Sequence, residues 1–460
     1  MLTDTIAAIA TAPGEAGVAI IRVSGSQVLA IWRCLFRTVQ DQPLLDPVPR
    51  YAYFGKIVDE KGKLIDTVLA FYMQAPHSFT GEDIMEIHCH GGFMAPMLIL
   101  KALYAAGAVS PEPGEFSQRA FINGKMDLTQ AEAIADIIQA KSAAALSIAQ
   151  KQLAGKLGKA VAEQADLLLD LLAAIEVAVD YPEEETDIWQ NMGFTEKLGT
   201  ALAEVNRLLA AAAEGKLYRE GIKTAIIGPA NAGKSTLLNA FLEEDRAIVT
   251  NIAGTTRDTI EEYYTVSGVL FKLIDTAGIR QSHDPVETRG ISRSLAAMQE
   301  ADLLLAVFDA SAELPQGWQE LLAKVADKPI IILLNKQDKA PNHDLAQVLK
   351  AVCPKADILP ISAAHGRGIN ELKELLLAKF SNREVNADDL QGMVNERPKA
   401  ALAKAKSHLE AAINGYEAGI EGDMLSIDIQ AAWQALAEIT GAVSSDDIIT
   451  RVFSRFCLGK

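Results

Sequence analysis

The feature that most constrains the fold is a glycine-rich segment, residues 228–235, between an apolar run and a helical pattern. It reads Gly-Pro-Ala-Asn-Ala-Gly-Lys-Ser, which fits the phosphate-loop pattern G-x-x-x-x-G-K-S/T. The apolar run 222–227 predicts a buried strand, and residues 236–240 predict a helix. Backbone N–H groups of such a loop and of the first helical turn bind phosphate oxygens. The segment therefore predicts a nucleotide-binding α/β domain, with Lys234 on the β- and γ-phosphates and Ser235 on Mg²⁺.

Four further apolar runs alternate with helical stretches after this loop. They cover residues 269–274, 303–308, 330–334 and 358–361. Apolar strands that alternate with helices are typical of a mostly parallel sheet covered on both faces.

Polar motifs follow three of these runs: Asp275-Thr276-Ala277-Gly278, Asn335-Lys336-Gln337-Asp338 and Ser362-Ala363-Ala364. Asp338 can accept hydrogen bonds from N1–H and the 2-amino group of guanine, a donor pair that adenine lacks. We expect Asp275 to hold Mg²⁺ through water, the Gly278 amide to contact the γ-phosphate, and residues 362–364 to close over the base. These motifs predict GTP as the ligand and a Ras-like P-loop GTPase domain.

The segment 254–258 (Gly-Thr-Thr-Arg-Asp) holds Thr256, the candidate switch threonine that closes on Mg²⁺ when the γ-phosphate is present. Ser235 and Thr256 are therefore the predicted Mg²⁺ ligands. The predicted GTP-binding residues are Asn231, Ala232, Gly233, Lys234, Ser235, Thr236, Thr250, Asn251, Ile252, Ala253, Gly254, Thr255, Thr256, Asp275, Thr276, Ala277, Gly278, Asn335, Lys336, Asp338, Ser362, Ala363 and Ala364.

Two residues bear on hydrolysis. Ile279 stands where Ras-like enzymes have a water-orienting glutamine, and its side chain cannot orient water. Asn231 matches the asparagine that binds K⁺ in GTPases that use this ion in place of an arginine finger; a hydrogen bond within the loop is the alternative. The predicted K⁺ ligands are Asn231, Thr250, Ile252 and Thr255. Positive charge there stabilises the transition state.

Glu287, in the second switch, is the candidate for orienting the attacking water, and an exposed carboxylate of the switch helix is the alternative. The predicted catalytic residues are Asn231, Lys234 and Glu287.

The remaining chain predicts two kinds of structure around the GTPase domain. Residues 1–120 show short β-rich runs with Pro and Gly between them, which indicates a mixed α/β domain. Residues 121–217 and 383–460 show helical spacing, with a break near Gly155 or Gly158 and a stop at Gly441. We predict a discontinuous helical domain into which a GTPase domain, residues 218–382, is inserted.

Composition excludes several classes of protein. A net charge of −17 argues against a general nucleic-acid-binding module, although tRNA could bind a local basic patch or a basic partner. The four cysteines have no paired spacing, which disfavours a disulfide framework. No apolar run reaches membrane-spanning length and no secretory signal is evident, so a cytoplasmic location is expected.

The whole chain resembles the MnmE (TrmE) family of bacterial tRNA-modification GTPases. Beyond Asn231 and Ile279, the resemblance lies in residues 4–11, 17–25, 78–83, 86, 90–92, 113–117, 119–121 and 123–133, and in the terminal Cys457-Leu458-Gly459-Lys460.

The resemblance implies an N-terminal domain that binds a tetrahydrofolate derivative and forms a homodimer. Arg22, Glu86, Lys125 and Lys460 would lie in the folate pocket. It also implies K⁺-dependent pairing of GTPase domains, with Glu287 as the water-orienting residue. The flavoprotein partner would be MnmG (GidA), in a heterotetramer. Together they would install a (carboxymethyl)aminomethyl group on C5 of wobble uridine 34 of tRNA, with a carbon from methylenetetrahydrofolate; 5-formyltetrahydrofolate is the other candidate ligand.

One segment departs from the family. His88-Cys89-His90 replaces a stretch with fewer metal-binding side chains, and on a strand His88 and His90 share a face. Two ligands alone are a poor metal site. Cys457 is either a reactive thiol or a structural residue.

Two other functions are compatible with parts of the sequence. A ribosome-assembly GTPase shares this kind of phosphate loop but usually carries a basic RNA-binding module, and residues after 385 are not notably basic. A folate-dependent one-carbon transferase gated by GTP would need a nucleophile or base that the N-terminal residues do not reveal.

Overall fold

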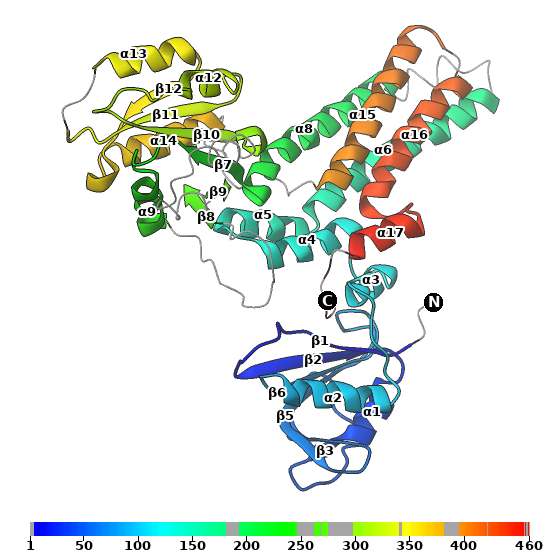
Figure 1. Ribbon diagram of the computed structural model, residues 1–460. Coiled ribbons are helices and arrows are strands. Elements are labelled where there is room, and N and C mark those ends of the chain that lie inside the picture. Colours follow the sequence, from blue (N-terminus) through cyan, green and yellow to red (C-terminus); the bar gives the residue numbers. More distant parts are fainter. Residues whose placement is uncertain are drawn as a thin grey trace. The chain divides into compact units, whose positions relative to one another are not determined.

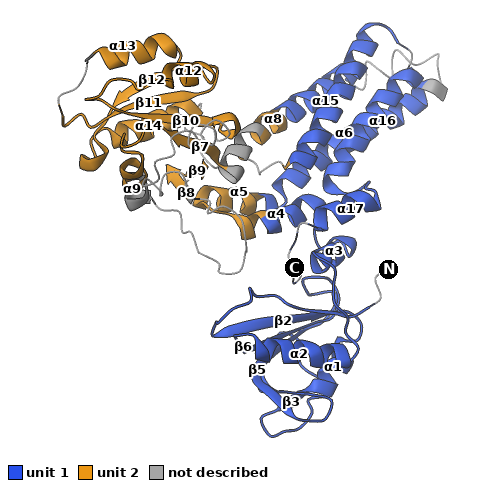
Figure 2. Cartoon of the chain, in the orientation of Figure 1, with its two compact units in different colours: residues 1–135, 152–206, 396–460 blue, residues 136–151, 207–395 orange. Residues whose placement is uncertain are grey.

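The computed structural model describes residues 4–180, 193–245, 262–266, 268–274, 298–339, 343–380, 395–420, 422–454, 456 and 459. The chain forms two compact units (Figure 2). The first contains residues 1–135, 152–206 and 396–460, and the second contains residues 136–151 and 207–395. The domain boundaries expected from the sequence stay predictions.

The first unit begins with a six-stranded antiparallel sheet in the order β1-β2-β6-β5-β4-β3 (Figure 1). Its strands are β1 (Ile6–Ile9), β2 (Val18–Ser24), β3 (Phe36–Thr38), β4 (Ala52–Val58), β5 (Leu64–Met73) and β6 (Ile84–His90). Alternate residues such as Ile21, Val23 and Ile87 pack on helices α1 (Val28–Leu35) and α2 (Met94–Ala105). The mixed α/β character predicted for this region is confirmed.

The opposite face of this sheet carries a different set of side chains. Near β1, Ile6 and Ala8 are buried under Phe116 of α3 (Glu115–Ile122) and are contacted by Phe79. Further along the face lie the partly exposed Arg22, Glu86 and His88. This face is therefore only partly covered.

Helices form the remainder of the first unit. Three long ones pack together: α6 (Lys156–Asp180), α15 (Glu396–Glu417) and α16 (Gly422–Thr440). Gly155, with a φ of +80°, separates α6 from α5 (Ala143–Leu153), and Gly441, with a φ of +85°, ends α16. Both positions need a left-handed backbone, which glycine adopts without strain. The predicted break and stop are confirmed, and Gly158 lies inside α6.

Shorter helices join these elements within the first unit. Aromatic and aliphatic side chains of α3, α4 (Leu128–Gln139) and α17 (Asp446–Phe453) share one cluster, which includes Phe121, Leu128 and Phe453. None of the described helices combines the length and the apolarity that a membrane crossing requires.

The second unit contains a six-stranded sheet in the order β12-β11-β10-β7-β9-β8, in which only β8 and β9 pair antiparallel. The strands are β7 (Ile222–Ile227), β8 (Glu262–Val266), β9 (Val269–Ile274), β10 (Leu303–Asp309), β11 (Ile330–Asn335) and β12 (Asp357–Pro360). One apolar cluster joins the sheet to α9 (Lys234–Asp245) and α14 (Ile369–Phe380), and another joins it to α12 (Trp318–Ala323) and α13 (His343–Val352). The predicted, mostly parallel sheet with helices on both faces is confirmed.

The antiparallel hairpin β8–β9 contacts a segment that is distant in sequence. The Lys141 ammonium lies 3.6 Å from the centre of the Tyr263 ring, and a Cβ built on Gly268 would lie 3.3 Å from Ala144 Cβ. Residues 136–151, which include α5 as far as Lys151, belong to the second unit together with α8 (Phe194–Glu220) from residue 207 onward.

Candidate functional site

The phosphate loop connects β7 to α9, and two of its glycines are required by close packing. A Cβ on Gly228 would lie 2.1 Å from the carbonyl oxygen of Val307, and a Cβ on Gly233 would lie 2.1 Å from Asn335 Nδ2. Asn231 has a φ of +61°, in the left-handed region that asparagine tolerates better than most residues. The loop thus fits between β10 and the end of β11.

Asn335 and Lys336 bind the backbone of this loop. Asn335, at the end of β11, donates from Nδ2 to the Ala232 carbonyl oxygen (2.9 Å) and accepts from the Ala363 N–H (3.0 Å). Lys336 donates from Nζ to the Asn231 carbonyl oxygen (2.6 Å). The structure therefore brings together three separate segments of the predicted GTP site.

Asp309 is a member of this network that sequence reasoning missed. It ends β10, and its Oδ2 accepts from Lys336 Nζ at 2.7 Å. Partial burial opposes ionisation, but hydrogen bonds from Lys336 and Ser311 outweigh it and lower the pKa of Asp309 to about 2. The available signal was its position after an apolar run, as with the other motif residues.

Asp338 and Ser362, the residues predicted to contact the base, are hydrogen-bonded to each other. Ser362 Oγ donates to Asp338 Oδ1 at 2.6 Å, and His365 Nδ1 lies 3.0 Å from the same hydroxyl. The hydrogen bond from Ser362, with smaller contributions from a backbone N–H, His365 and Lys339, lowers the pKa of Asp338. A carboxylate that stays ionised suits the acceptor role predicted for it.

Lys234 lies against the backbone of the phosphate loop. Its Nζ donates to the carbonyl oxygens of Gly228 (2.8 Å) and Pro229 (2.6 Å). Burial lowers the pKa of Lys234. Ser235 and Thr236 follow it in the first turn of α9, both exposed, and Ala364 lies in the short 3₁₀ helix η2 (Ala363–His365).

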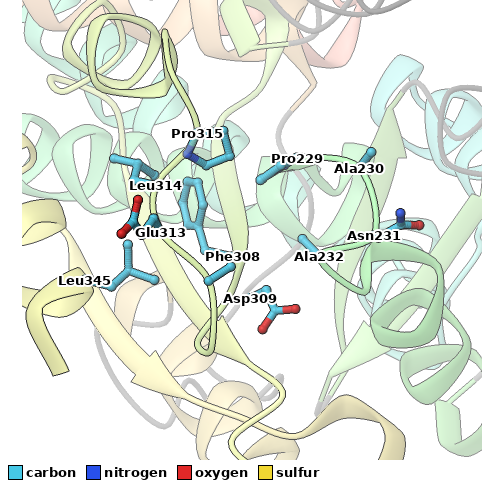
Figure 3. A pocket seen from close by; sticks show the side chains of 11 residues that line it. Pro229, Ala230, Asn231, Ala232, Phe308, Asp309, Glu313, Leu314, Pro315 and Leu345 are labelled. Atoms are coloured by element: carbon cyan, nitrogen blue, oxygen red, sulfur yellow. The ribbon is translucent and has the colours of Figure 1, made fainter. Parts of the chain in front are cut away.

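A small pocket flanks the phosphate loop (Figure 3). Its volume is about 120 Å³, and it lies between residues 229–232 and the segment after β10 that runs to Pro315. Phe308, Leu314 and Leu345 give it a mostly apolar lining, with the Asp309 and Glu313 carboxylates among the wall residues.

The other predicted residues of the GTPase site lie outside the described residues. They are Thr250, Asn251, Ile252, Ala253, Gly254, Thr255, Thr256, Asp275, Thr276, Ala277, Gly278, Ile279 and Glu287.

The N-terminal residues predicted to bind folate are partly brought together. Arg22 and Glu86 are direct neighbours on β2 and β6, and Arg22 Nη2 lies 2.7 Å from Glu86 Oε1. The Arg22 guanidinium also lies 5.3 Å from the centre of the Phe79 ring. Lys125 donates from Nζ to the Pro76 carbonyl oxygen at 3.0 Å, so it contacts the same 76–81 segment as Arg22.

The C-terminal end of the chain reaches the same domain. A Cβ on Gly459 would lie 2.4 Å from the Ile9 carbonyl oxygen, at the end of β1. Gly459 is therefore packed against the sheet that carries Arg22, while Lys460 and Cys457 lie outside the described residues.

His88 and His90 do not converge. His90 Nδ1 is 2.8 Å from Asp66 Oδ1, whereas the His88 ring lies 4.9 Å from the Phe71 ring and is tilted by 51° to it. Among the described residues, no group of three His, Cys, Asp or Glu side chains could hold a metal ion.

Sequence models of known protein families match both the N-terminal region and the region that contains the helical segments. A sequence model described as the MnmE helical domain matches residues 128–457, and one described as the GTP-binding protein TrmE N-terminus matches residues 5–125. The tRNA modification GTPase MnmE of Lacticaseibacillus paracasei is 43% identical over 458 residues, which are 99% of this chain and 98% of that protein. The chain belongs to the MnmE (TrmE) family. MnmE of Geobacillus kaustophilus is 41% identical over 459 residues, 99% of each chain.

MnmE relatives match this chain from end to end, which confirms the resemblance expected from the sequence and makes the chain a GTP-hydrolysing enzyme. Among solved structures, the G domain of the T. maritima FeoB iron transporter is 24% identical over 35% of this chain and 98% of that one, at a TM-score of 0.25. The assignment to the MnmE family therefore rests on the full-length relatives and the two domain models.

Proposed function

We propose that this chain hydrolyses GTP with K⁺ and Mg²⁺ and uses the cycle to modify tRNA in the cytoplasm. The reaction installs a (carboxymethyl)aminomethyl group on C5 of wobble uridine 34, together with the flavoprotein MnmG (GidA) in a heterotetramer. A methylenetetrahydrofolate carbon bridges the group to the base. Full-length relatives named tRNA modification GTPase support the tRNA substrate.

The observation that carries the nucleotide part is the binding of the phosphate loop by Asn335 and Lys336. Lys336 fixes the carbonyl of Asn231 at 2.6 Å, and the Asn231 side chain is exposed beside the phosphates' expected position. A fixed backbone with an exposed side-chain oxygen fits a K⁺ ligand, because a ligand on a rigid backbone coordinates with little reorganisation. Thr250, Ile252 and Thr255 would complete the K⁺ site.

The residues at the start of α9 fit a Mg²⁺–nucleotide complex. Lys234 is held at the loop backbone and Ser235 is exposed in the first helical turn. Mg²⁺ takes oxygen ligands, which Ser235 and Thr256 offer. We assign the orientation of the attacking water to Glu287, because Ile279 cannot perform it.

The N-terminal sheet fits a folate. Arg22 and Glu86 offer a cation and a carboxylate side by side, and in the part of the chain that the structure describes the buried ring nitrogen His88 Nε2 has no hydrogen-bond partner. Polar groups that are buried without a partner are rare in native proteins, so a ligand at this position is a physical explanation for it. Lys125 and Lys460 would bind the remainder of the ligand.

Helix α2 supports a homodimer through the N-terminal domain. The exposed side of the helix and the residue before it carries Phe93, Met94, Met97 and Leu98, each between 44% and 69% exposed. Adjacent exposed apolar side chains of this size usually mark an interface. A dimer of N-terminal domains would also tether the two GTPase domains, so that their K⁺-dependent pairing would occur within one dimer.

The test is the GTP hydrolysis rate in K⁺ and in Na⁺ for the wild type and for Asn231→Ala. We expect K⁺ to accelerate the wild type strongly and Asn231→Ala to lose at least tenfold of that stimulation, since one transition-state contact is worth about 10²–10³ in rate. Equal rates in the two salts would refute the K⁺ site. Normal modification of uridine 34 in a deletion strain would refute the tRNA function independently.

A further inference from the structure

His88 lies on β6 two residues from Glu86, on the same face of the sheet. Its Nε2 is buried and has no hydrogen-bond partner among the described residues, and Glu86 Oε2 is 3.8 Å away, too far for a hydrogen bond. Its direct neighbours on the adjacent strands are Ile20 and Leu69. Neither side chain is polar, so neither of them can serve as the partner of Nε2.

Only one oxygen of the Glu86 carboxylate, Oε1, is contacted by Arg22. Arg22 donates from Nε (2.8 Å) and approaches with Nη2 (2.7 Å), and both contacts are with Oε1. Oε2 remains as an acceptor next to His88 Nε2. The ring of His88 is positioned by Phe71, whose centre lies 4.9 Å from it. The face therefore presents a carboxylate acceptor 3.8 Å from a ring nitrogen, which is a donor in the tautomer that carries its proton on Nε2.

A ligand that satisfies both atoms needs a donor and an acceptor on neighbouring atoms of one edge. The lactam edge of a 2-amino-4-oxopteridine has this arrangement, with N3–H next to the C4 carbonyl. We propose that His88 donates from Nε2 to the C4 carbonyl oxygen of such a ring, while Glu86 Oε2 accepts from its N3–H. His88 is thus a specificity-determining residue that recognises the 4-oxo group. The inference rests on the proposed binding of folate and adds a residue to it.

The experiment compares two ligands that differ on this edge, folic acid and its 4-amino analogue aminopterin, by calorimetric titration of the full chain. The variant His88→Phe keeps an aromatic ring on Phe71 but has no donor, and His88→Gln keeps a donor. Aminopterin also lacks N3–H, but that difference is present for wild type and variants alike. For each protein we take the ratio of its dissociation constants for folic acid and aminopterin. A change in this ratio between wild type and a variant therefore reports the contact at C4.

A matched control is His90→Phe, which changes the same residue type on the same strand. His90 is exposed and pairs with Asp66 rather than facing Glu86. Thermal unfolding of every variant shows whether the domain stays folded.

We expect His88→Phe to bind folic acid about tenfold more weakly, the upper range for one neutral hydrogen bond, and to bind aminopterin no more weakly than wild type does, because the 4-amino group accepts no hydrogen bond from Nε2. His88→Gln and His90→Phe should bind folic acid within about threefold of wild type. If folic acid binds wild type and His88→Phe equally, the role of His88 is refuted and folate binding stands. If wild type binds neither folic acid nor 5-formyltetrahydrofolate, the folate proposal fails and this inference fails with it.

Discussion

Gly233 shows at the scale of one residue why the phosphate loop tolerates so little change. In Gly233→Ala, a Cβ would meet Asn335 Nδ2 at 2.1 Å and displace its hydrogen bond to Ala232. A buried amide without a partner costs about 1–3 kcal/mol. The left-handed φ of +99° adds about 1–2 kcal/mol for a residue with a Cβ. We predict that GTP affinity falls at least tenfold in a fluorescent-nucleotide titration and that the unfolding temperature falls.

Gly317→Ala is the control that distinguishes backbone strain from the steric overlap expected in Gly233→Ala. Gly317 has a φ of +84°, but a Cβ there would meet no atom of the described residues within 4 Å. It should lose stability through strain alone and keep its nucleotide affinity. Equal effects of the two substitutions would refute the packing argument.

Ser362 controls the ionisation of the residue proposed to read guanine. Its hydrogen bond is the largest cause of the low pKa of Asp338, so Ser362→Ala should move that pKa upward. A carboxyl group with a lowered pKa remains ionised as the pH falls, and one with a higher pKa is protonated earlier. Titration of GDP affinity from pH 6 down to about pH 3, through the ordinary carboxyl range, should therefore show the loss of binding at a higher pH in the variant.

Ser311→Ala is the control for this profile, because Ser311 makes a similar bond, 2.7 Å long, to Asp309 instead. Its GDP profile should follow that of the wild type in this pH range. Coinciding profiles for Ser362→Ala and wild type would contradict the role given to Asp338.

At the scale of helices, Arg397 connects three elements of the first unit. It donates to Glu132 Oε1 on α4 (2.8 Å) and to the carbonyl oxygens of Glu438 (2.8 Å) and Ile439 (2.9 Å) at the end of α16. The last carbonyls of a helix have no partners within it. Arg397→Met would leave them and the Glu132 carboxylate unpaired, and we predict a loss of about 2–4 kcal/mol in the free energy of unfolding.

Denaturant unfolding would measure this loss. The control is Arg33→Met, which breaks the ion pair between Arg33 and Asp46, whose side chains are 46% and 85% exposed. Exposed pairs contribute about 0–1 kcal/mol, so this variant should be nearly as stable as wild type. A cost for Arg397→Met no larger than that for Arg33→Met would rule out the proposed bridging role.

The positions of strands and helix ends could be predicted from the sequence, whereas the contacts between elements could not. The pattern of apolar residues predicted the strands of the parallel sheet. The conformational freedom of glycine predicted the helix ends at Gly155 and Gly441. Both are local properties of the chain. The pairing of Asp309 with Lys336 and the contact of Lys141 with Tyr263 join residues far apart in sequence. Such pairs depend on tertiary packing, which no local pattern encodes. Arg397 was missed for the same reason.

At the scale of the whole molecule, the apolar side of α2 leads to a prediction about catalysis in the other unit. If the N-terminal domains form a dimer, a second GTPase domain is always present at an effective concentration of about millimolar. The K⁺-stimulated rate per chain should then be independent of protein concentration in the wild type. Met97→Glu places a charge on an exposed apolar surface, where Met97 is 56% exposed, and should dissociate the dimer with little cost to the monomer fold.

For Met97→Glu we predict a monomer in analytical ultracentrifugation and a hydrolysis rate per chain that rises with protein concentration, because pairing has become bimolecular. Val48→Glu is the control: Val48 is 62% exposed but lies apart from α2 in sequence, between β3 and β4, and the variant should stay dimeric with a constant rate. A Met97→Glu protein that remains a dimer would exclude α2 as the interface. A monomer whose rate does not depend on concentration would instead show that hydrolysis needs no second GTPase domain, and the pairing mechanism would be wrong.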